Sequence, residues 1–261
     1  MKSKFKFLML SYFFLLLSYR MFAQGPPIFT ETPIMFGVEG RGVRTFGNIV
    51  KKENGSAYIQ PMAIPYNITN KWQVGAIVPF VVITPNGMST NSGLGDINIF
   101  VKRQLYQIDG KAKTLRGLLK ITETLPTGKT LGMPPLGANA WQTYVSTANA
   151  YVTTKFGIYS EIGYTIKSNN LTDNFIYNFA FGLPLLPQKY PPKQLNVYLE
   201  LNGMYEFDNI GNTLFISPGL QFIAGRKFLI ESGIQLPLEQ SAPEGQQTVY
   251  VLRIGTRILI F

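Results

Sequence analysis

The chain has 261 residues, with 24 Lys and Arg against 14 Asp and Glu, and it contains neither His nor Cys. The lack of these two residue types excludes disulfides, thiolate nucleophiles, iron–sulfur ligation and any catalytic triad that uses His. Charged residues make up only 15% of the chain, where an ordinary soluble domain carries about 25%. The mean hydropathy of +0.08 is nevertheless too low for a helical membrane protein.

The first residues predict a secretory signal peptide over 1–23. Three lysines precede an apolar run over residues 7–17, and Ala23 offers a small residue for cleavage before Gln24. An uncleaved anchor is the alternative, but the run is shorter than the about 20 apolar residues of a spanning helix. Cleavage would leave 20 basic and 14 acidic residues, a net charge of +6. No run of Lys or Arg indicates nucleic-acid binding.

The rest of the chain predicts β-strands. Apolar residues recur with period two over segments of about ten residues, and Gly, Pro, Asn and Asp separate these segments. The pattern gives twelve strands, an even number that suits a barrel with both termini on one side. Their expected ranges are 34–49, 56–66, 71–83, 95–107, 112–124, 140–153, 156–167, 173–184, 194–206, 213–223, 227–238 and 247–260.

The alternation separates apolar from polar residues. In segment 194–206, Leu195, Val197, Leu199 and Leu201 oppose Asn196, Tyr198, Glu200 and Asn202. A secreted β-sandwich alternates too, and it remains the alternative fold. The signal peptide, the low charge and the 13% aromatic content favour apolar residues facing lipid and polar residues facing a lumen. We therefore expect a 12-stranded antiparallel transmembrane β-barrel at 34–261, in the bacterial outer membrane, preceded by a short periplasmic segment at 24–33. Plugging of the lumen by this Pro- and Gly-rich segment is the alternative that the sequence leaves open.

Loop lengths predict the orientation. If the mature N-terminus is periplasmic, the connections after odd-numbered strands face outward, and these include the long stretches 84–94 and 125–139. Connections on the other side, such as 108–111 and 224–226, are short. Outer-membrane barrels have this arrangement of short periplasmic turns and longer extracellular loops. The Pro-rich stretch 185–193 is an exception.

The C-terminus resembles the assembly signal of bacterial outer-membrane barrels. A polar residue, a Gly two residues later, two spaced apolar residues and a terminal aromatic residue form that signal. Here these positions are Arg253, Gly255, Ile258, Ile260 and Phe261.

Two further motifs resemble a known family. Ser92-Gly93-Leu94-Gly95-Asp96-Ile97 is followed by Lys102-Arg103, and the segment 119–125 runs into Pro126-Thr127-Gly128-Lys129. These motifs resemble the outer-membrane "MetA-pathway of phenol degradation" family of transporters, and segment 233–238 and the final strand also match. The resemblance implies an outer-membrane β-barrel that moves small compounds, aromatic or apolar ones among them. It identifies no substrate.

The two motif halves are predicted to meet at the extracellular rim. The fourth and fifth strands are joined at Asp109-Gly110, and a three- or five-residue loop there would place Asp96 opposite Thr124. The motif residues are Gly93, Gly95, Asp96, Pro126, Thr127 and Gly128. They could bind a cation or polar ligand, but we favour a loop anchor in which Asp96 accepts hydrogen bonds from backbone N–H groups.

Charged residues on the polar faces are expected to line the lumen. They are Lys102, Arg116, Lys120, Glu161, Glu200, Glu231, Arg253 and Arg257. They could form the lining of an anion-selective pore, or an ion-pair network that plugs and braces the barrel. The second interpretation is slightly favoured, because unpaired buried charge is expensive.

The sequence therefore predicts a passive channel or transporter and no enzyme. Small molecules, apolar or aromatic ones included, would diffuse through the lumen or laterally through the wall. The alternative is a closed structural barrel whose extracellular loops bind a partner or surface ligand. No metal site and no cofactor are expected. The expected partners are outer-membrane lipid, the barrel-assembly machinery during biogenesis and a small-molecule solute of unknown identity, with no nucleic acid.

Overall fold

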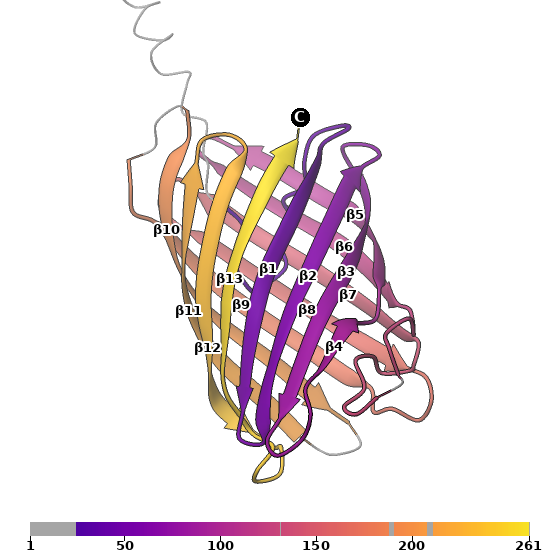
Figure 1. Ribbon diagram of the computed structural model, residues 1–261. Helices are drawn as coiled ribbons and strands as arrows, with labels where there is room; N and C mark the ends of the chain where they lie inside the picture. The colour runs from indigo at the N-terminus through magenta and orange to yellow at the C-terminus, as the bar shows by residue number, and fades with distance from the viewer. Residues whose placement is uncertain (1–24, 131, 188–190, 208–210, 261) are drawn as a thin grey trace, which may run out of the picture.

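The computed structural model describes residues 25–130, 132–187, 191–207 and 211–260, so the expected signal peptide lies outside the described residues. Twelve antiparallel strands form a closed barrel, and a short additional strand, β4, pairs with the second half of β3 (Figure 1). The strands are β1 (Arg41–Lys52), β2 (Gly55–Asn67), β3 (Trp72–Pro85), β4 (Asn91–Leu94), β5 (Asn98–Gly110), β6 (Lys113–Thr124), β7 (Gln142–Thr153), β8 (Gly157–Lys167), β9 (Asn174–Pro184), β10 (Lys193–Glu206), β11 (Gly211–Ala224), β12 (Phe228–Gln240) and β13 (Thr248–Ile260).

The barrel closes where the first and last strands meet. Apart from β4, which pairs only with the second half of β3, neighbouring strands in the chain pair with each other. The first half of β3 pairs with β5, and β1 pairs with both β2 and β13. The β1–β13 ladder runs from Arg41 opposite Ile260 to Lys52 opposite Thr248. The sheet thereby closes on itself through β1 and β13, as a strand-built membrane protein requires. Among the described residues, no helix is long and apolar enough to cross a membrane.

Most strand bounds agree with the sequence prediction to within three residues, and the first strand does not. β1 begins at Arg41, whereas the alternation predicted residue 34. Before β1 the chain makes a turn in which Glu39 has a φ of 58° and the N–H of Gly40 donates to the carbonyl of Gly37. The side chain of Asn67 also donates to the carbonyl of Phe36. Several backbone groups of residues 34–40 therefore have partners outside the β1 ladder.

The register between β5 and β6 also differs from the prediction. Asn98, not Asp96, lies opposite Thr124, and the turn falls at residues 111–112 rather than at Asp109-Gly110. A β-bulge at Leu105 shifts the register by one residue partway along the ladder. The bulge adds one residue to β5 between the turn and Lys102. Beyond the bulge, Lys102 therefore lies directly opposite Lys120, and the two lysines share the inner face.

The outer surface of the wall is apolar and the inner surface is polar. On β8, Ile162 and Ile166 are 52% and 56% exposed, while the alternating Glu161 is only 5% exposed. On β10, Leu199 is 49% exposed and its neighbour Glu200 is fully buried. An apolar belt of this extent around a closed barrel suits lipid rather than water.

The two rims of the barrel carry connections of different length. One rim carries residues 86–97 and 125–141, and the other carries short connections such as 111–112, 154–156 and 225–227. The C-terminus lies at the second rim, where β1 begins (Figure 1). We name the first the extracellular rim and the second the periplasmic rim, following the loop-length rule for outer-membrane barrels. The connection 185–192 is still the exception on the periplasmic side.

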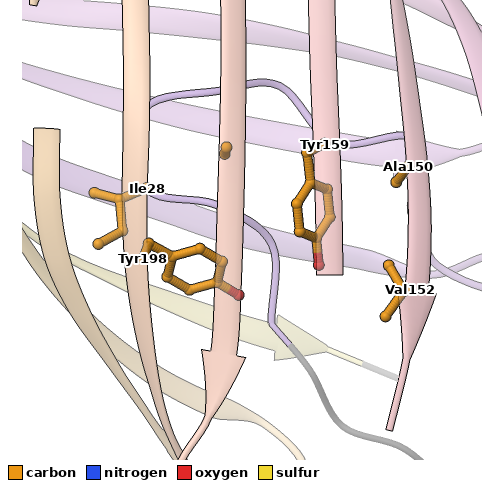
Figure 2. Close-up of a cluster of buried hydrophobic side chains, with 6 residues drawn as sticks. Ile28, Ala150, Val152, Tyr159 and Tyr198 are labelled. Atoms are coloured by element: carbon orange, nitrogen blue, oxygen red, sulfur yellow. The ribbon is translucent and has the colours of Figure 1, made fainter. Parts of the chain in front are cut away.

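The buried apolar cluster lies inside the barrel. Ile28 of the N-terminal segment packs with residues from β7 to β10, and Phe29 and Ile34 pack against this cluster. Figure 2 shows Tyr159 and Tyr198 pointing into the lumen on either side of the segment's path. The wall members are Ala150, Val152, Tyr159, Ala180 and Tyr198.

Candidate functional site

Residues 25–36, which we call the plug segment, lie inside the barrel (Figure 1). The sequence predicted a periplasmic segment at 24–33 and left a lumen plug as the alternative. The described residues 25–33 lie in the lumen, as in that alternative. Pro26, Pro27 and Pro33 lack the N–H that a strand ladder needs, so the segment does not extend β1. Side chains of the wall make the hydrogen bonds that a neighbouring strand would otherwise supply.

The carboxylate of Glu200 holds the backbone N–H groups of the plug segment. It accepts from the N–H groups of Ile28 at 2.8 Å, Phe29 at 3.1 Å and Thr30 at 2.7 Å. The hydroxyl of Thr30 also donates to Glu200, at 2.7 Å. Glu200 is fully buried, and these donors replace the water that its charge would otherwise need.

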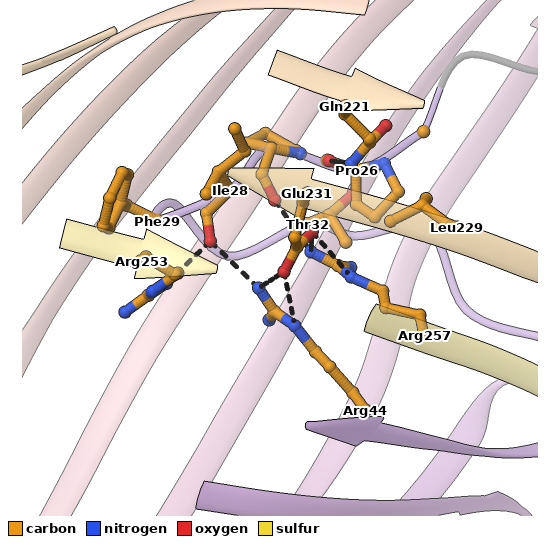
Figure 3. A network of polar contacts seen from close by, with 12 residues as sticks. Pro26, Ile28, Phe29, Thr32, Arg44, Gln221, Leu229, Glu231, Arg253 and Arg257 are labelled. Atoms are coloured by element: carbon orange, nitrogen blue, oxygen red, sulfur yellow. Dashed lines mark hydrogen bonds and ion pairs between the residues drawn. The ribbon is translucent and has the colours of Figure 1, made fainter. Parts of the chain in front are cut away.

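Donors from the wall bind the backbone carbonyls of the plug segment. Tyr159 and Tyr198 both donate to the carbonyl of Gly25, and the amide of Gln221 donates to that of Pro26 at 2.7 Å. Two guanidinium groups, from Arg44 at 2.9 Å and Arg253 at 2.7 Å, converge on the carbonyl of Ile28 (Figure 3). The segment is therefore bound through its backbone as well as through its side chains.

A buried ion triad lies beside this backbone. Glu231 is fully buried and pairs with Arg44 at 2.8 Å through one oxygen and with Arg257 at 2.8 Å through the other. Arg257 also donates to the carbonyl of Pro27 at 3.0 Å. The triad joins β1, β12 and β13 to the plug segment, close to the seam where the barrel closes (Figure 3).

The second ion cluster is centred on Glu31 of the plug segment. Its carboxylate pairs with Lys102 at 2.9 Å and Lys120 at 2.7 Å, and its N–H donates to Glu161 at 3.2 Å. Burial raises the pKa of the Glu31 carboxyl, but the two lysines outweigh it and hold that pKa well below its ordinary value. Glu161 is satisfied by Tyr144 at 2.9 Å and by Asn178 at 2.8 Å.

Seven of the eight residues predicted to line the lumen surround the plug segment. They are Lys102, Lys120, Glu161, Glu200, Glu231, Arg253 and Arg257. The eighth, Arg116, lies apart near the periplasmic rim and faces Asp109 at 3.8 Å. The sequence did not identify Glu31 and Arg44, which complete the two ion clusters. Glu31 lay in the expected periplasmic segment, and Arg44 lay in the strand whose start was misplaced.

Tyr159, Tyr198 and Gln221 were also not predicted as site residues. The period-two pattern placed the two tyrosines on the polar face, but an inward tyrosine gives no sign of what it binds. Their target is a backbone carbonyl more than 130 residues away in sequence.

The lumen beside the plug segment is not completely filled. A cavity of about 640 Å³ lies between the segment and the wall and extends to the periplasmic rim. Apolar and aromatic side chains line much of it, among them Ile34, Phe36, Phe46, Ile77 and Phe100. Volume and lining are in the range of small-molecule binding sites in proteins.

The extracellular rim motif forms a loop anchor. Asp96 accepts from the N–H of Gly128 at 2.7 Å through one oxygen and from the N–H of Ala138 at 2.7 Å through the other. The hydroxyl of Thr127 accepts from the N–H of Ile97 at 2.9 Å. The two motif halves therefore meet as predicted, although the β5–β6 register from which we predicted it was wrong. Gly93 and Gly95 lie against Leu136 of the same loop, and Pro126 follows β6 directly.

The assembly-signal residues lie on the closing strand β13. Gly255 faces Phe46 of β1, while Ile258 and Ile260 are 45% and 43% exposed on the outer surface. Phe261 lies outside the described residues.

No family model matches this sequence, and no curated protein sequence matches it. Among solved structures, a COG4313 outer membrane channel from Pseudomonas putida F1 aligns with a TM-score of 0.69 at 12% identity, over 91% of this chain and 100% of that one. The β-domain of the Bordetella autotransporter BrkA aligns with a TM-score of 0.50 at 10% identity, over 84% of this chain and 99% of that one. At such identities the likeness is one of fold. Together with the apolar outer belt, it establishes the chain as a β-barrel of the bacterial outer membrane.

Proposed function

We propose that this protein is a passive outer-membrane channel for small molecules, apolar or aromatic ones included, and that the plug segment closes it to ions. Solutes would diffuse through the part of the lumen that the segment leaves open, or through a wider path when the segment moves. Nothing in this mechanism requires catalysis or an energy source.

One observation carries the proposal, namely that the plug segment fills part of the lumen and leaves beside it a cavity whose lining is more apolar than polar, although Lys102, Lys120 and Arg253 also border it. The filled part is occupied by buried ion pairs and by hydrogen bonds to the segment's backbone. The remaining space has a mainly apolar and aromatic lining. A hydrated ion would have to shed its water in such a cavity, whereas an apolar solute would not.

Single-channel conductance in a planar bilayer tests the proposal. Three proteins are compared: the mature chain 24–261, a variant with residues 25–36 replaced by Gly and Ser at equal length, and a control with the exposed Gln246 replaced by Ser. We expect small or no steps from the mature chain and the control, and steps several-fold larger from the plug variant. Equal conductance in all three folded proteins would contradict closure by the plug segment. The absence of current steps from all three folded proteins would favour a closed barrel whose outer loops bind a partner.

Passage of the solute itself needs a second measurement. Proteoliposomes containing the mature chain should admit naphthalene-sized apolar solutes faster than protein-free vesicles of the same lipid, and should exclude sugars of similar size. If apolar solutes and sugars entered at equal rates, and the protein changed neither rate relative to protein-free vesicles, the proposal would be contradicted.

We further propose that the chain belongs to the "MetA-pathway of phenol degradation" family. The loop anchor built from Asp96, Thr127 and Gly128 gives the family-like motif a structural role and supports this assignment. Contact with outer-membrane lipid and delivery by the barrel-assembly machinery are part of the same proposal, because the apolar belt and the C-terminal strand are features that both would recognise.

A further inference from the structure

One guanidinium group in the lumen, that of Arg253, makes no ion pair with any residue that the structure describes. Arg253 donates to the side chain of Asn48 at 2.8 Å and to the carbonyl of Ile28 at 2.7 Å, which are both neutral acceptors. Within the described part of the chain it forms no ion pair, whereas Arg44 and Arg257 share Glu231. Two of its five N–H groups are therefore used, and its charge is not neutralised by contact.

The faces of this guanidinium are covered by two aromatic rings. Phe29 of the plug segment and Phe46 of β1 each lie 4.3 Å from it, ring centroid to central carbon. Stacking between two rings stabilises the cation and fixes the plane of the group. Further hydrogen bonds can therefore form only at its edge, and Arg253 is one of the residues that line the 640 Å³ cavity.

The charges around the plug segment do not balance. Five cations surround it, and four carboxylates face them, which leaves one positive charge in excess. The cations are Arg44, Lys102, Lys120, Arg253 and Arg257, and the carboxylates are Glu31, Glu161, Glu200 and Glu231. An uncompensated charge in a mostly apolar cavity is expensive, and an anionic ligand beside it would remove that penalty.

The rest of the cavity fits the body of such a ligand. Away from Arg253 the lining includes Ile34, Phe36, Ile77 and Phe100, and at the periplasmic rim it includes Arg226 and Lys227. A flat or extended apolar group can pack against the first four residues. The two cations at the rim would raise the local concentration of anions at the cavity mouth.

We propose that the cavity binds an amphipathic organic anion, an aromatic or short aliphatic carboxylate, with its head group on the open edge of Arg253. A carboxylate suits this edge because a guanidinium can donate two parallel hydrogen bonds to its two oxygens. The inference rests on the proposed channel function and narrows its solute class from apolar molecules to apolar molecules that carry one negative charge.

Equilibrium binding of 2-naphthoate to the mature chain tests this assignment. The protein is placed in nanodiscs of neutral phosphatidylcholine, and binding is measured by calorimetry beside the uncharged 2-naphthamide and the cationic 2-naphthylmethylammonium. We expect the anion to bind at least tenfold more tightly than the amide, with no detectable binding of the cation. Equal affinity for anion and amide would overturn the proposal.

Variants locate the site. Arg253→Gln should weaken naphthoate binding at least tenfold, and Arg253→Lys should retain part of it because the charge remains. Arg116→Gln is the matched control, since Arg116 lies outside the cavity lining and should leave binding unchanged. If Arg253→Gln does not fold, Ile77→Asp supplies the test, because a carboxylate at another position of the cavity lining would neutralise the excess charge and abolish binding. Unchanged binding in folded Arg253→Gln or Ile77→Asp would overturn the assignment.

Together, the naphthoate-binding and flux measurements distinguish failure of the anion site from failure of the channel. Tight, Arg253-dependent naphthoate binding without flux into proteoliposomes would support the anion site and contradict the channel. Flux of apolar solutes without any naphthoate binding would support the channel and overturn the anion site.

Discussion

At the level of single residues, two buried glutamates organise the lumen in different ways. Glu200 binds three backbone N–H groups of the plug segment, and Glu231 binds two guanidinium groups of the wall. Each has both carboxylate oxygens in hydrogen bonds, which makes it possible for both side chains to be completely buried. Glu200 thus fixes where the segment lies, and Glu231 fixes the arginines that bind the segment's carbonyls.

We expect Glu231→Gln to destabilise the barrel strongly. The change leaves Arg44 and Arg257 buried without a counter-charge, and breaking a buried ion pair in this way costs about 3–5 kcal/mol. The free energy of unfolding, measured by guanidinium titration in lipid vesicles, should fall accordingly. Glu239→Gln, an exposed glutamate that binds Asn212, is the control and should change little. If the two substitutions lowered the free energy of unfolding equally, water would have to compensate the charges of Arg44 and Arg257 in place of Glu231.

Asp96→Ala should loosen one loop without unfolding the barrel. The N–H groups of Gly128 and Ala138 would lose a charged acceptor, at about 1.5–3 kcal/mol for each hydrogen bond. Limited proteolysis should then cut within residues 125–141, while the yield of folded protein stays normal. Asp96→Asn keeps one acceptor oxygen and should be cut more slowly. A normal loop together with lost solute passage would instead indicate a ligand site at this rim.

At the level of elements, the closing seam and the plug segment depend on each other. β1 and β13 pair along their full length, and both supply arginines that hold the segment. The chain reverses at residues 37–40 to leave the lumen and enter β1. Docking of the segment and closure of the barrel therefore involve the same two strands.

The glycine of the assembly signal has a packing role in this seam. An added Cβ at Gly255 would lie 2.6 Å from the Cβ of Phe46 and 3.1 Å from the carbonyl oxygen of Thr45. Both atoms are close to the backbone and cannot swing aside. We expect Gly255→Ala to destabilise the folded barrel by about 1–3 kcal/mol, the usual effect of overpacking.

The same titration in vesicles measures this effect. Gly37→Ala is the control, because nothing lies within 4 Å of the added atom there. Equal stability of the two variants would mean that β1 and β13 can separate to accommodate the methyl group.

The plug segment should remain docked under mildly acidic conditions. Because the lysines hold the Glu31 pKa below its ordinary value of 4.5, its contribution to docking is complete above that pH. It is lost only as the pH falls through the lowered value. We therefore expect the same conductance from the mature chain at pH 7 and pH 5, and a higher conductance from Glu31→Gln at both. Opening of the unmodified channel between pH 7 and pH 5 would contradict this account.

At the level of the whole molecule, the barrel separates three environments. The apolar belt faces lipid, the ion clusters occupy the lumen, and two rims of different loop length face the two sides of the membrane. Alternation within each strand produces the first two environments at once, because neighbouring residues point to opposite faces.

Lysine substitutions on the outer surface should reveal the lipid belt. Leu199 lies at the middle of β10 and is 49% exposed, and Leu238 lies near the end of β12 and is 58% exposed. In vesicles, Leu199→Lys should lower the free energy of unfolding by about 2–4 kcal/mol and Leu238→Lys by about 0–1 kcal/mol. Equal, small effects would contradict a belt centred on the strand midpoints.

The sequence alone determined the wall of this protein. The period of two, the turn residues and the loop lengths predicted twelve barrel strands, their inner and outer faces and most of the charged lumen residues, because each of these is a local property of the chain. The bulge at Leu105 escaped prediction, since one extra outward residue leaves the hydrophobic pattern almost unchanged. The start of β1 escaped it as well, because residues 34–40 alternate like a strand.

Only the tertiary structure decided what occupies the lumen. The plug segment is held by contacts between Ile28 and Glu200, Glu31 and Lys102, and Gly25 and Tyr198, and these partners are more than 70 residues apart. Most of these contacts use backbone N–H and carbonyl groups, which every residue carries and which no sequence pattern marks. Closing the barrel brings the partners together. Among the described residues, the same closure leaves Arg253 as the one cation around the plug segment without a carboxylate in contact.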